Sequence, residues 1–139
     1  MPNNGPVLVN DDDVDECELL KDVFEQLNIA NKLLCFLEGK EALDYLRHTT
    51  EQPFLILSDV NMPGMSGLEL RSIINADEML RQKSIPFIFL TTTVSAPALK
   101  DAYEMSVQGY FEKPHEIAEI KKLIQEIYLY WQRCRHPKN

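Results

Sequence analysis

The sequence predicts an α/β fold, a doubly wound parallel sheet of five strands with helices on both faces. Apolar runs of four to six residues alternate five times with longer segments of helical period, a pattern typical of successive βα units. Two of the runs, FLIL and FIFL, are apolar at every position, as strands covered on both faces must be. Because crossovers are right-handed, the most economical strand order is 2-1-3-4-5, the flavodoxin-like (βα)5 arrangement.

The strands are expected where the apolar runs lie. In chain order they are Pro6–Asn10, Lys32–Phe36, Phe54–Ser58, Pro86–Leu90 and Gly109–Glu112. The third and fourth strands carry the two fully apolar runs, so they are expected at the centre of the sheet. The strand order makes the first and third strands neighbours, with the fourth beside the third.

The helices are expected between the strands, at about Val14–Leu27, Gly39–His48, Gly67–Arg81, Ala96–Ser106 and His115–Arg133. Apolar residues at helical spacing give these helices a stripe that can pack on the sheet. The clearest stripes are Leu19, Leu20, Val23, Phe24 and Leu27 in the first helix, Ala42, Leu43 and Leu46 in the second, and Ile120, Leu123, Ile124, Ile127 and Trp131 in the last. The charged segment Asn75–Ser84 suggests a lengthened third helix or a long loop after it.

Length and charge limit the classes of function. The chain has 139 residues and a net charge of −8. Its length fits one domain, expected over residues 6–133, with short tails at 1–5 and 134–139 and no output domain. The negative charge argues against partners such as nucleic acid or anionic membranes, which attract clustered Lys and Arg. Proteins or small phosphates are the expected partners.

The cysteines and the N-terminus indicate the compartment. Cys17, Cys35 and Cys134 are odd in number and widely spaced, which favours reduced thiols, and each is interpreted as a small buried hydrophobe. The N-terminal MPNNGP has neither a basic patch nor an apolar run. No apolar stretch approaches the roughly 20 residues that a membrane span needs. We therefore expect a cytoplasmic protein.

Acidic residues follow two strands that the strand order makes neighbours. Asp11 and Asp12 follow the first strand and Asp59 follows the third. Ligands of open α/β sheets gather at the carboxyl ends of the strands, where strand order reverses. Three carboxylates in one crevice would repel one another, but a hard divalent cation between their oxygens makes the cluster tolerable, and oxygen ligands suit Mg²⁺. Thr91 and Lys113, which follow the fourth and fifth strands, are expected to face the same crevice.

Taken alone, the acidic run has other interpretations. It could be a solvated helix start, since acids favour the N-terminal end of the helix dipole, and Asp13 and Asp15 are assigned to that role. The alternating acids also resemble a calcium loop, but Glu16 stands where such a loop needs Gly and Asp22 where it needs Glu. No GxGxxG or GxxxxGK[ST] motif is present to indicate nucleotide binding.

Four motifs in order, at βα spacing, resemble the receiver domain of two-component response regulators, of the stand-alone kind found in chemotaxis. They are VLVNDDD after the first strand, LSDVNMPGMSGLEL around Asp59, FIFLTTT after the fourth strand and GYFEKP around Lys113. The resemblance covers nearly the whole chain. Asn10, Val14 and Thr92 depart from the usual pattern, and the bulk of Thr92 puts the rate of phosphorylation in doubt.

The resemblance implies a role for each residue of the motifs. Asp59 would be the phospho-acceptor, with Mg²⁺ bound directly by Asp12, through water by Asp11, and by the backbone carbonyl of Asn61. Thr91 and Lys113 would contact the phosphoryl oxygens. Tyr110 would swing inward on activation, as part of a switch with Thr91. The side chains of Asn61 and Thr93 would tune the rate of dephosphorylation. A cis Lys113–Pro114 bond is also implied, which would aim the ammonium inward.

The function implied is a phosphorylatable receiver rather than an enzyme, with only self-phosphorylation and self-dephosphorylation chemistry. The phosphoryl donor would be a histidine kinase or a histidine phosphotransfer protein, and the downstream partner would be an unidentified protein. The chain itself would be a monomer or a phosphorylation-dependent dimer. Two alternatives stay open: an unphosphorylated receiver-fold interaction module, and a Mg²⁺-dependent phosphohydrolase. The absence of a second acid just beyond Asp59, which could protonate a leaving group, speaks against the hydrolase.

Overall fold

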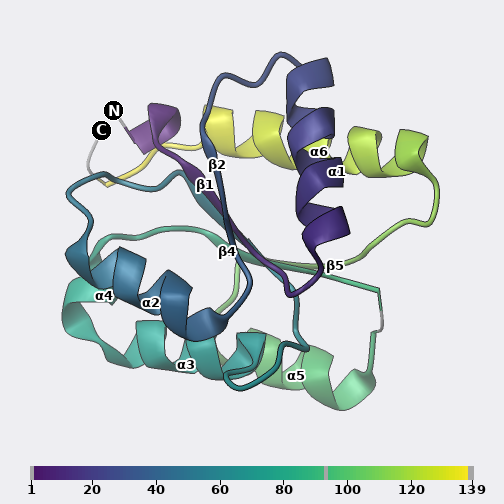
Figure 1. Cartoon of the computed structure of the whole chain (residues 1–139). Helices are drawn as coiled ribbons and strands as arrows, with labels where there is room; N and C mark the ends of the chain where they lie inside the picture. The colour runs from purple at the N-terminus through teal and green to yellow at the C-terminus, as the bar shows by residue number, and fades with distance from the viewer. Residues whose placement is uncertain (1, 93, 138–139) are drawn as a thin grey trace.

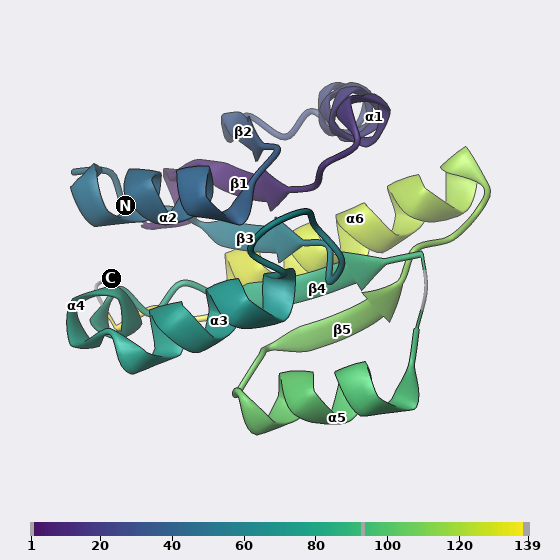
Figure 2. The ribbon, with the colours of Figure 1, turned by 60° about the horizontal axis from the view of Figure 1, so that its bottom comes forward.

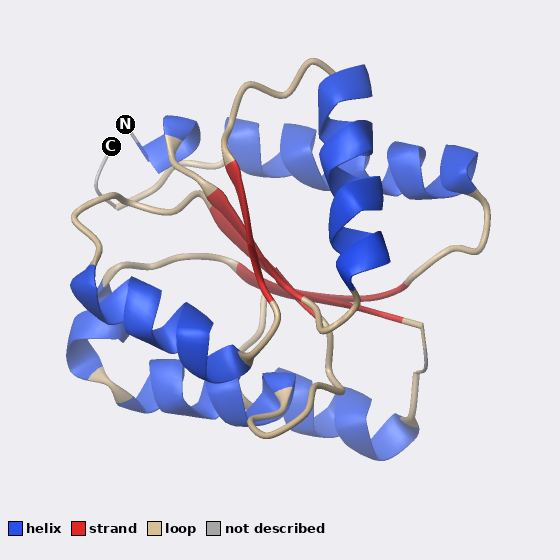
Figure 3. Ribbon diagram, viewed as in Figure 1, coloured by secondary structure: helices blue, strands red, loops and turns tan. Residues whose placement is uncertain are grey.

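Five parallel strands form one sheet in the order β2-β1-β3-β4-β5 in the computed structural model, which describes residues 2–92 and 94–137 (Figures 1 and 3). The strands are β1 (Val7–Asn10), β2 (Leu33–Phe36), β3 (Leu55–Ser58), β4 (Phe87–Thr91) and β5 (Gly109–Glu112). The predicted fold and strand order are therefore confirmed. Every residue of β1, β3 and β4 is buried, as strands covered on both faces must be.

Helices cover both faces of the sheet, and the buried apolar residues form two separate core clusters. On one face lie α1 (Val14–Gln26) and α6 (Ile117–Arg133), and on the other α2 (Gly39–His48), α3 (Gly67–Ala76), α4 (Glu78–Gln82) and α5 (Ala96–Glu104) (Figure 2). A short 3-10 helix, η1 (Pro2–Asn4), precedes β1. Val23 and Ile124 pack into the first cluster, and Leu46 and Leu70 into the second. None of the helices in residues 2–92 and 94–137 is long and apolar enough to cross a bilayer.

The predicted helix Gly67–Arg81 is wrong, because the structure divides it into α3 and α4 at Asp77. The backbone of Asp77 has φ −90° and ψ 115°, which is extended rather than helical. Its carboxylate Oδ1 accepts the N–H of Leu80 at 3.1 Å and so caps the start of α4. Asp competes in this way for backbone N–H groups and favours helix starts over helix interiors. The segment after α3 is thus a break followed by a short helix.

The helices that approach the site begin with side-chain caps. Asp13 caps α1 by accepting the N–H of Asp15 at 2.9 Å, so its assignment to the helix start is confirmed. Ser66 and Glu69 form a reciprocal capping box at the start of α3. Both caps lie in loops that follow a strand end, and they therefore limit how far these loops can move.

The cysteines only partly match their interpretation. All three thiols are free. Cys17, on α1, is buried in the first core cluster, and burial raises the pKa of its thiol to about 12. Cys35 and Cys134 are only half-buried. Cys35 lies on β2, in which every residue is half-buried, and Cys134 follows the last residue of α6.

Candidate functional site

The sheet register brings the acidic residues together at the carboxyl ends of the strands. Asn10, the last residue of β1, pairs with Ser58, the last residue of β3. Asp11 and Asp59 follow these two residues directly, and the backbone N–H of Asp59 donates to the carbonyl of Asn10 at 2.9 Å. Neighbouring parallel strands lie about 4.8 Å apart, so two side chains that follow paired residues start close to each other.

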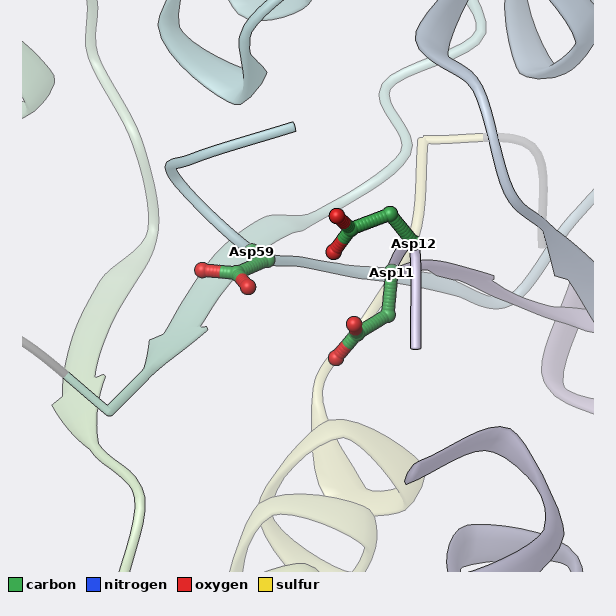
Figure 4. Close-up of side chains that lie close together, drawn as sticks. All are labelled: Asp11, Asp12 and Asp59. Atoms are coloured by element: carbon green, nitrogen blue, oxygen red, sulfur yellow. The ribbon is translucent and has the colours of Figure 1, made fainter. Parts of the chain in front are cut away.

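Carboxylates from Asp11, Asp12 and Asp59 converge in one small space (Figure 4). One oxygen from each lies within 4.8 Å of the others. Asp11 is buried, Asp59 is half-buried and Asp12 is exposed, so the cluster is open to solvent on one side. Three hard oxygen donors at this spacing fit a divalent cation with part of its water shell retained, which is the usual state of Mg²⁺ in proteins. The predicted gathering of these acids is observed.

Backbone N–H groups hold two of the carboxylates in place. Asp11 Oδ1 accepts the N–H of Asp13 at 2.9 Å, and Asp59 Oδ1 accepts the N–H groups of Val60 at 2.7 Å and Asn61 at 3.4 Å. Burial raises the pKa of Asp11, and the negative charge of Asp59 acts in the same direction. The N–H of Asp13 and the ammonium of Lys113 oppose that rise. Burial and the neighbouring carboxylate thus act against the ionised form of Asp11, while one backbone N–H and one ammonium support it.

Lys113 enters the crevice from the end of β5. Its side chain is 5% exposed, and its Nζ lies 3.3 Å from Asp11 Oδ2 and 3.0 Å from Glu16 Oε2. Burial alone would lower the pKa of Lys113, but the hydrogen bonds and charges of Glu16 and Asp11 outweigh it and raise that pKa. The ammonium thus stays charged in the crevice. A cavity of about 10 Å³ is lined by Asp11, Asp59 and Lys113 together, so the lysine shares the space that the acids face.

Glu16 is a site residue that sequence reasoning missed. It lies in the first turn of α1, where an acid is usually explained by the helix dipole. The signal that could have found it is its position: the first turn of a helix that directly follows the carboxyl end of β1 faces the crevice. The cis Lys113–Pro114 bond implied by the resemblance is wrong for this structure, since residues 2–92 and 94–137 contain no cis peptide bond. The ammonium reaches Asp11 from a trans backbone.

Thr91 and Tyr110 lie on one face of the sheet beside the crevice. Thr91 ends β4, is 1% exposed, and accepts the backbone N–H of Lys113 at its carbonyl, 2.7 Å away. Tyr110 packs its ring 5.7 Å from that of Phe89, and its hydroxyl is buried without a hydrogen-bond partner among the described residues. Burial, followed by the charge of Asp59, raises the pKa of Tyr110. The Tyr110 hydroxyl is thus buried in this structure, where the charge of Asp59 acts on it.

The remaining predicted residues lie in the loops around the crevice. Asn61 is exposed, two residues beyond Asp59, with its backbone N–H turned to the Asp59 carboxylate. Thr93 lies outside the described residues. Asn10, which departs from the resembled pattern, is 1% exposed, and neither polar atom of its side-chain amide has a partner among the described residues. Asn10 lines the same small cavity as Asp11, Asp59 and Lys113.

Comparison with known proteins finds close similarity over nearly the whole chain. The sequence profile described as response regulator receiver domain matches residues 7–125. The probable methanogenesis regulatory protein FilR2 of Methanothrix harundinacea is 34% identical over 90% of this chain and 82% of its own length.

Solved structures show the same fold. The phosphorylated cyanobacterial phytochrome response regulator RcpA superposes with a TM-score of 0.84 at 22% identity, covering 94% of this chain and 96% of that chain. The Mn²⁺-bound form of the response regulator Rcp1 superposes with a TM-score of 0.80 at 24% identity, with the same coverage of both chains. At such identities the likeness shows the shared architecture.

Proposed function

The chain belongs to the response regulator receiver domain family, and from this membership we propose that it accepts a phosphoryl group on Asp59 and signals by contact with another protein. Receiver domains are signalling modules of two-component systems rather than enzymes. The donor proposed is a histidine kinase or a histidine phosphotransfer protein. The observation that carries the proposal is the gathering of Asp11, Asp12, Asp59 and Lys113 around one crevice.

Asp59 is the proposed nucleophile. Its Oδ1 is held by two backbone N–H groups, whereas Oδ2 has no hydrogen bond from the described residues. In the proposed step, Oδ2 forms a bond to phosphorus while the bond from phosphorus to the donor imidazole nitrogen breaks. The electron pair of that bond returns to the imidazole. A carboxylate is a modest nucleophile, but phosphoryl transfer depends mainly on position and on neutralisation of charge.

Two side chains of the crevice supply what the transferring group needs. The ammonium of Lys113 is a buried point charge that can contact the phosphoryl oxygens once it moves from Asp11 and Glu16. The hydroxyl of Thr91 is proposed to donate to another of these oxygens. Because Glu16 and Asp11 hold the lysine between them before transfer, they keep a cation ready in a site rich in carboxylates.

The carboxylates fit a divalent cation, which receiver domains bind at such an acidic cluster, and we assign Mg²⁺ to it. Asp12 and Asp59 would bind it directly, Asp11 through water, and Asn61 through its backbone carbonyl. Bound Mg²⁺ would neutralise negative charge on the phosphoryl oxygens. The exposed Asp12 leaves the site accessible, while the N–H groups that hold Asp11 and Asp59 keep their oxygens in place.

The Asp12→Asn variant should bind Mg²⁺ at least about tenfold more weakly than the natural chain, because even second-shell partners of metals contribute roughly this much. Calorimetric titration with MgCl2 would measure the affinity. Asp15→Asn removes one charge from the same segment but lies outside the cluster, so it should bind as the natural chain does. Equal losses in both variants would mean that general negative charge, not ligation, attracts the ion.

Decay of the phosphoryl group and the response to it are assigned to residues around the crevice. The side chains of Asn61 and Thr93 are proposed to set the rate at which water attacks the acyl phosphate.

Thr91 is proposed to move toward the new oxygens, and Tyr110 to fill the space behind it. Since the Tyr110 hydroxyl is already buried here, the proposed switch consists of stabilising this inward position. The surface of α5, β5 and α6 would then present a changed face to the partner.

Intact-mass measurement after incubation with MgCl2 and acetyl phosphate tests the proposal. The expected result is the gain of a single phosphoryl group that decays after the donor is removed. A chain that gains none would be an interaction module of receiver fold. Continuing release of phosphate from diverse phosphomonoesters would instead indicate a phosphohydrolase, and either of these two results would reject the proposed function.

A further inference from the structure

A second cavity lies at the end of the sheet opposite to the acidic crevice. It has a volume of about 350 Å³, within the range of small-molecule sites. Its lining includes Phe54 and Pro86, just before β3 and β4, and residues of α3, of α4 and of the end of α6. The segment after α6 runs beside α4 (Figure 2), where His136 Nε2 contacts the carbonyls of Lys83 at 3.1 Å and Ser84 at 3.2 Å.

The charge of this cavity is opposite to that of the chain. Three of the five arginines, Arg71, Arg81 and Arg135, line it together with His136. No Asp or Glu is among the described residues that line it. In a chain with 22 acidic and 14 basic residues, a cavity lined by cations without acids has a local potential that favours anions.

Arg71 is the least exposed of these cations. It is 7% exposed, and its Nε and Nη2 donate to the carbonyls of Met105 at 3.0 Å and Ser106 at 2.8 Å. Its guanidinium lies 5.6 Å from the centre of the Phe87 ring. No ion pair among the described residues includes Arg71, and burial lowers its pKa. A buried guanidinium usually has a carboxylate partner, and here the structure provides only carbonyls.

The rest of the wall is apolar. Ile74, Leu80, Ile85 and Trp131 line the cavity beside Phe54. Ligand sites combine such an apolar lining with a few charged groups that fix orientation, and Arg binds carboxylate, sulfonate and phosphate groups through paired N–H donors. We propose that this cavity binds a small organic anion, with an aromatic or aliphatic body against Trp131 and Phe54 and its acidic group at the arginines. This site is independent of the phosphoryl chemistry proposed for Asp59.

The aromatic sulfonate 8-anilinonaphthalene-1-sulfonate is a suitable probe, and Trp131, the single tryptophan of the chain, is the reporter. Titration of the full chain should give saturable binding of one probe, seen as energy transfer from Trp131 and as a shift of its indole N–H signal in NMR spectra. The uncharged analogue N-phenyl-1-naphthylamine should bind about tenfold or more weakly, a factor that corresponds to roughly 1.4 kcal/mol. Sodium sulfate at high concentration should compete with the sulfonate.

Arginine variants decide whether the charge recognises the probe. The double variant Arg81→Gln/Arg135→Gln changes two exposed residues, so it should fold, and it should lose about tenfold or more in affinity. Lys40→Gln/Lys100→Gln makes the same change of charge at exposed positions away from the cavity and should bind as the natural chain does. Equal affinity in the arginine variant and the natural chain, or equal binding of the uncharged analogue, would overturn the proposal and leave an apolar surface only.

Discussion

The Asp59→Asn variant is expected to gain no phosphoryl group from acetyl phosphate under conditions in which the natural chain gains one. The amide that replaces the carboxylate has no anionic oxygen to attack phosphorus, and the substitution also removes one of the three clustered carboxylates proposed to hold the cation. The loss should therefore be complete rather than partial. Intact-mass spectrometry of both proteins, incubated side by side with MgCl2, measures it directly.

Asp13→Asn is the matched control for this variant. It removes the same charge from the neighbouring loop, but Asp13 caps α1 and Asn also caps helices well, so the fold should be kept. This control should be phosphorylated like the natural chain. If Asp59→Asn still gained a phosphoryl group, the acceptor would be another residue of the cluster, and peptide mapping of the labelled protein would locate it at Asp11 or Asp12.

The architecture could be predicted because its determinants are local patterns. Continuous apolar runs identified the two central strands, and helical stripes such as that of α1 located the helices. The break at Asp77 could not be seen in the same way, because Leu80 is buried and continues the apolar stripe of α3 beyond it. Periodicity records which face is buried, whereas the end of a helix depends on one side chain that competes for backbone N–H groups.

The candidate site, too, could be predicted only in part. The meeting of Asp11, Asp12 and Asp59 followed from strand order, because parallel strands end at one edge of the sheet. The pairing of Lys113 with Glu16 did not follow, since it depends on the rotamers of two side chains from elements far apart in the sequence, β5 and α1. The inward position of the Tyr110 hydroxyl is a rotamer choice of the same kind. Roles that depend on topology are predictable, and those that depend on side-chain conformation need coordinates.

Gly67 connects stability and site geometry, and its replacement by Ala should have a large effect on both. A Cβ at this position would lie 2.1 Å from the backbone carbonyl oxygen of Asp59 and 2.8 Å from Cε1 of Phe89. The N–H of Gly67 also donates to the carbonyl of Val60 at 2.9 Å, which holds the loop after Asp59 against the start of α3. Neither the backbone of Asp59 nor the packed ring of Phe89 can yield without moving its neighbours.

We therefore expect Gly67→Ala to lower the free energy of unfolding by about 3 kcal/mol, the upper part of the range for overpacked cores. This exceeds the gain of roughly 0.5–1 kcal/mol that Ala brings over Gly within a helix. Urea unfolding followed by circular dichroism would measure the change in stability. The rate of phosphorylation by acetyl phosphate should also fall, because relief of the clash displaces Asp59 from Asp11 and Asp12.

Gly39→Ala is the matched control, since Gly39 is the first residue of α2 as Gly67 is of α3. A Cβ on Gly39 would lie no closer than 3.2 Å to Met65, so small shifts of that residue can accommodate it. The control should differ from the natural chain by less than about 1 kcal/mol, because the small steric cost opposes the helix gain. Equal stability of the two variants would contradict this expectation, because it would show that the start of α3 can move away from Asp59 at little cost. The contact between α3 and the loop after Asp59 would then not be needed to hold the carboxylate in the crevice.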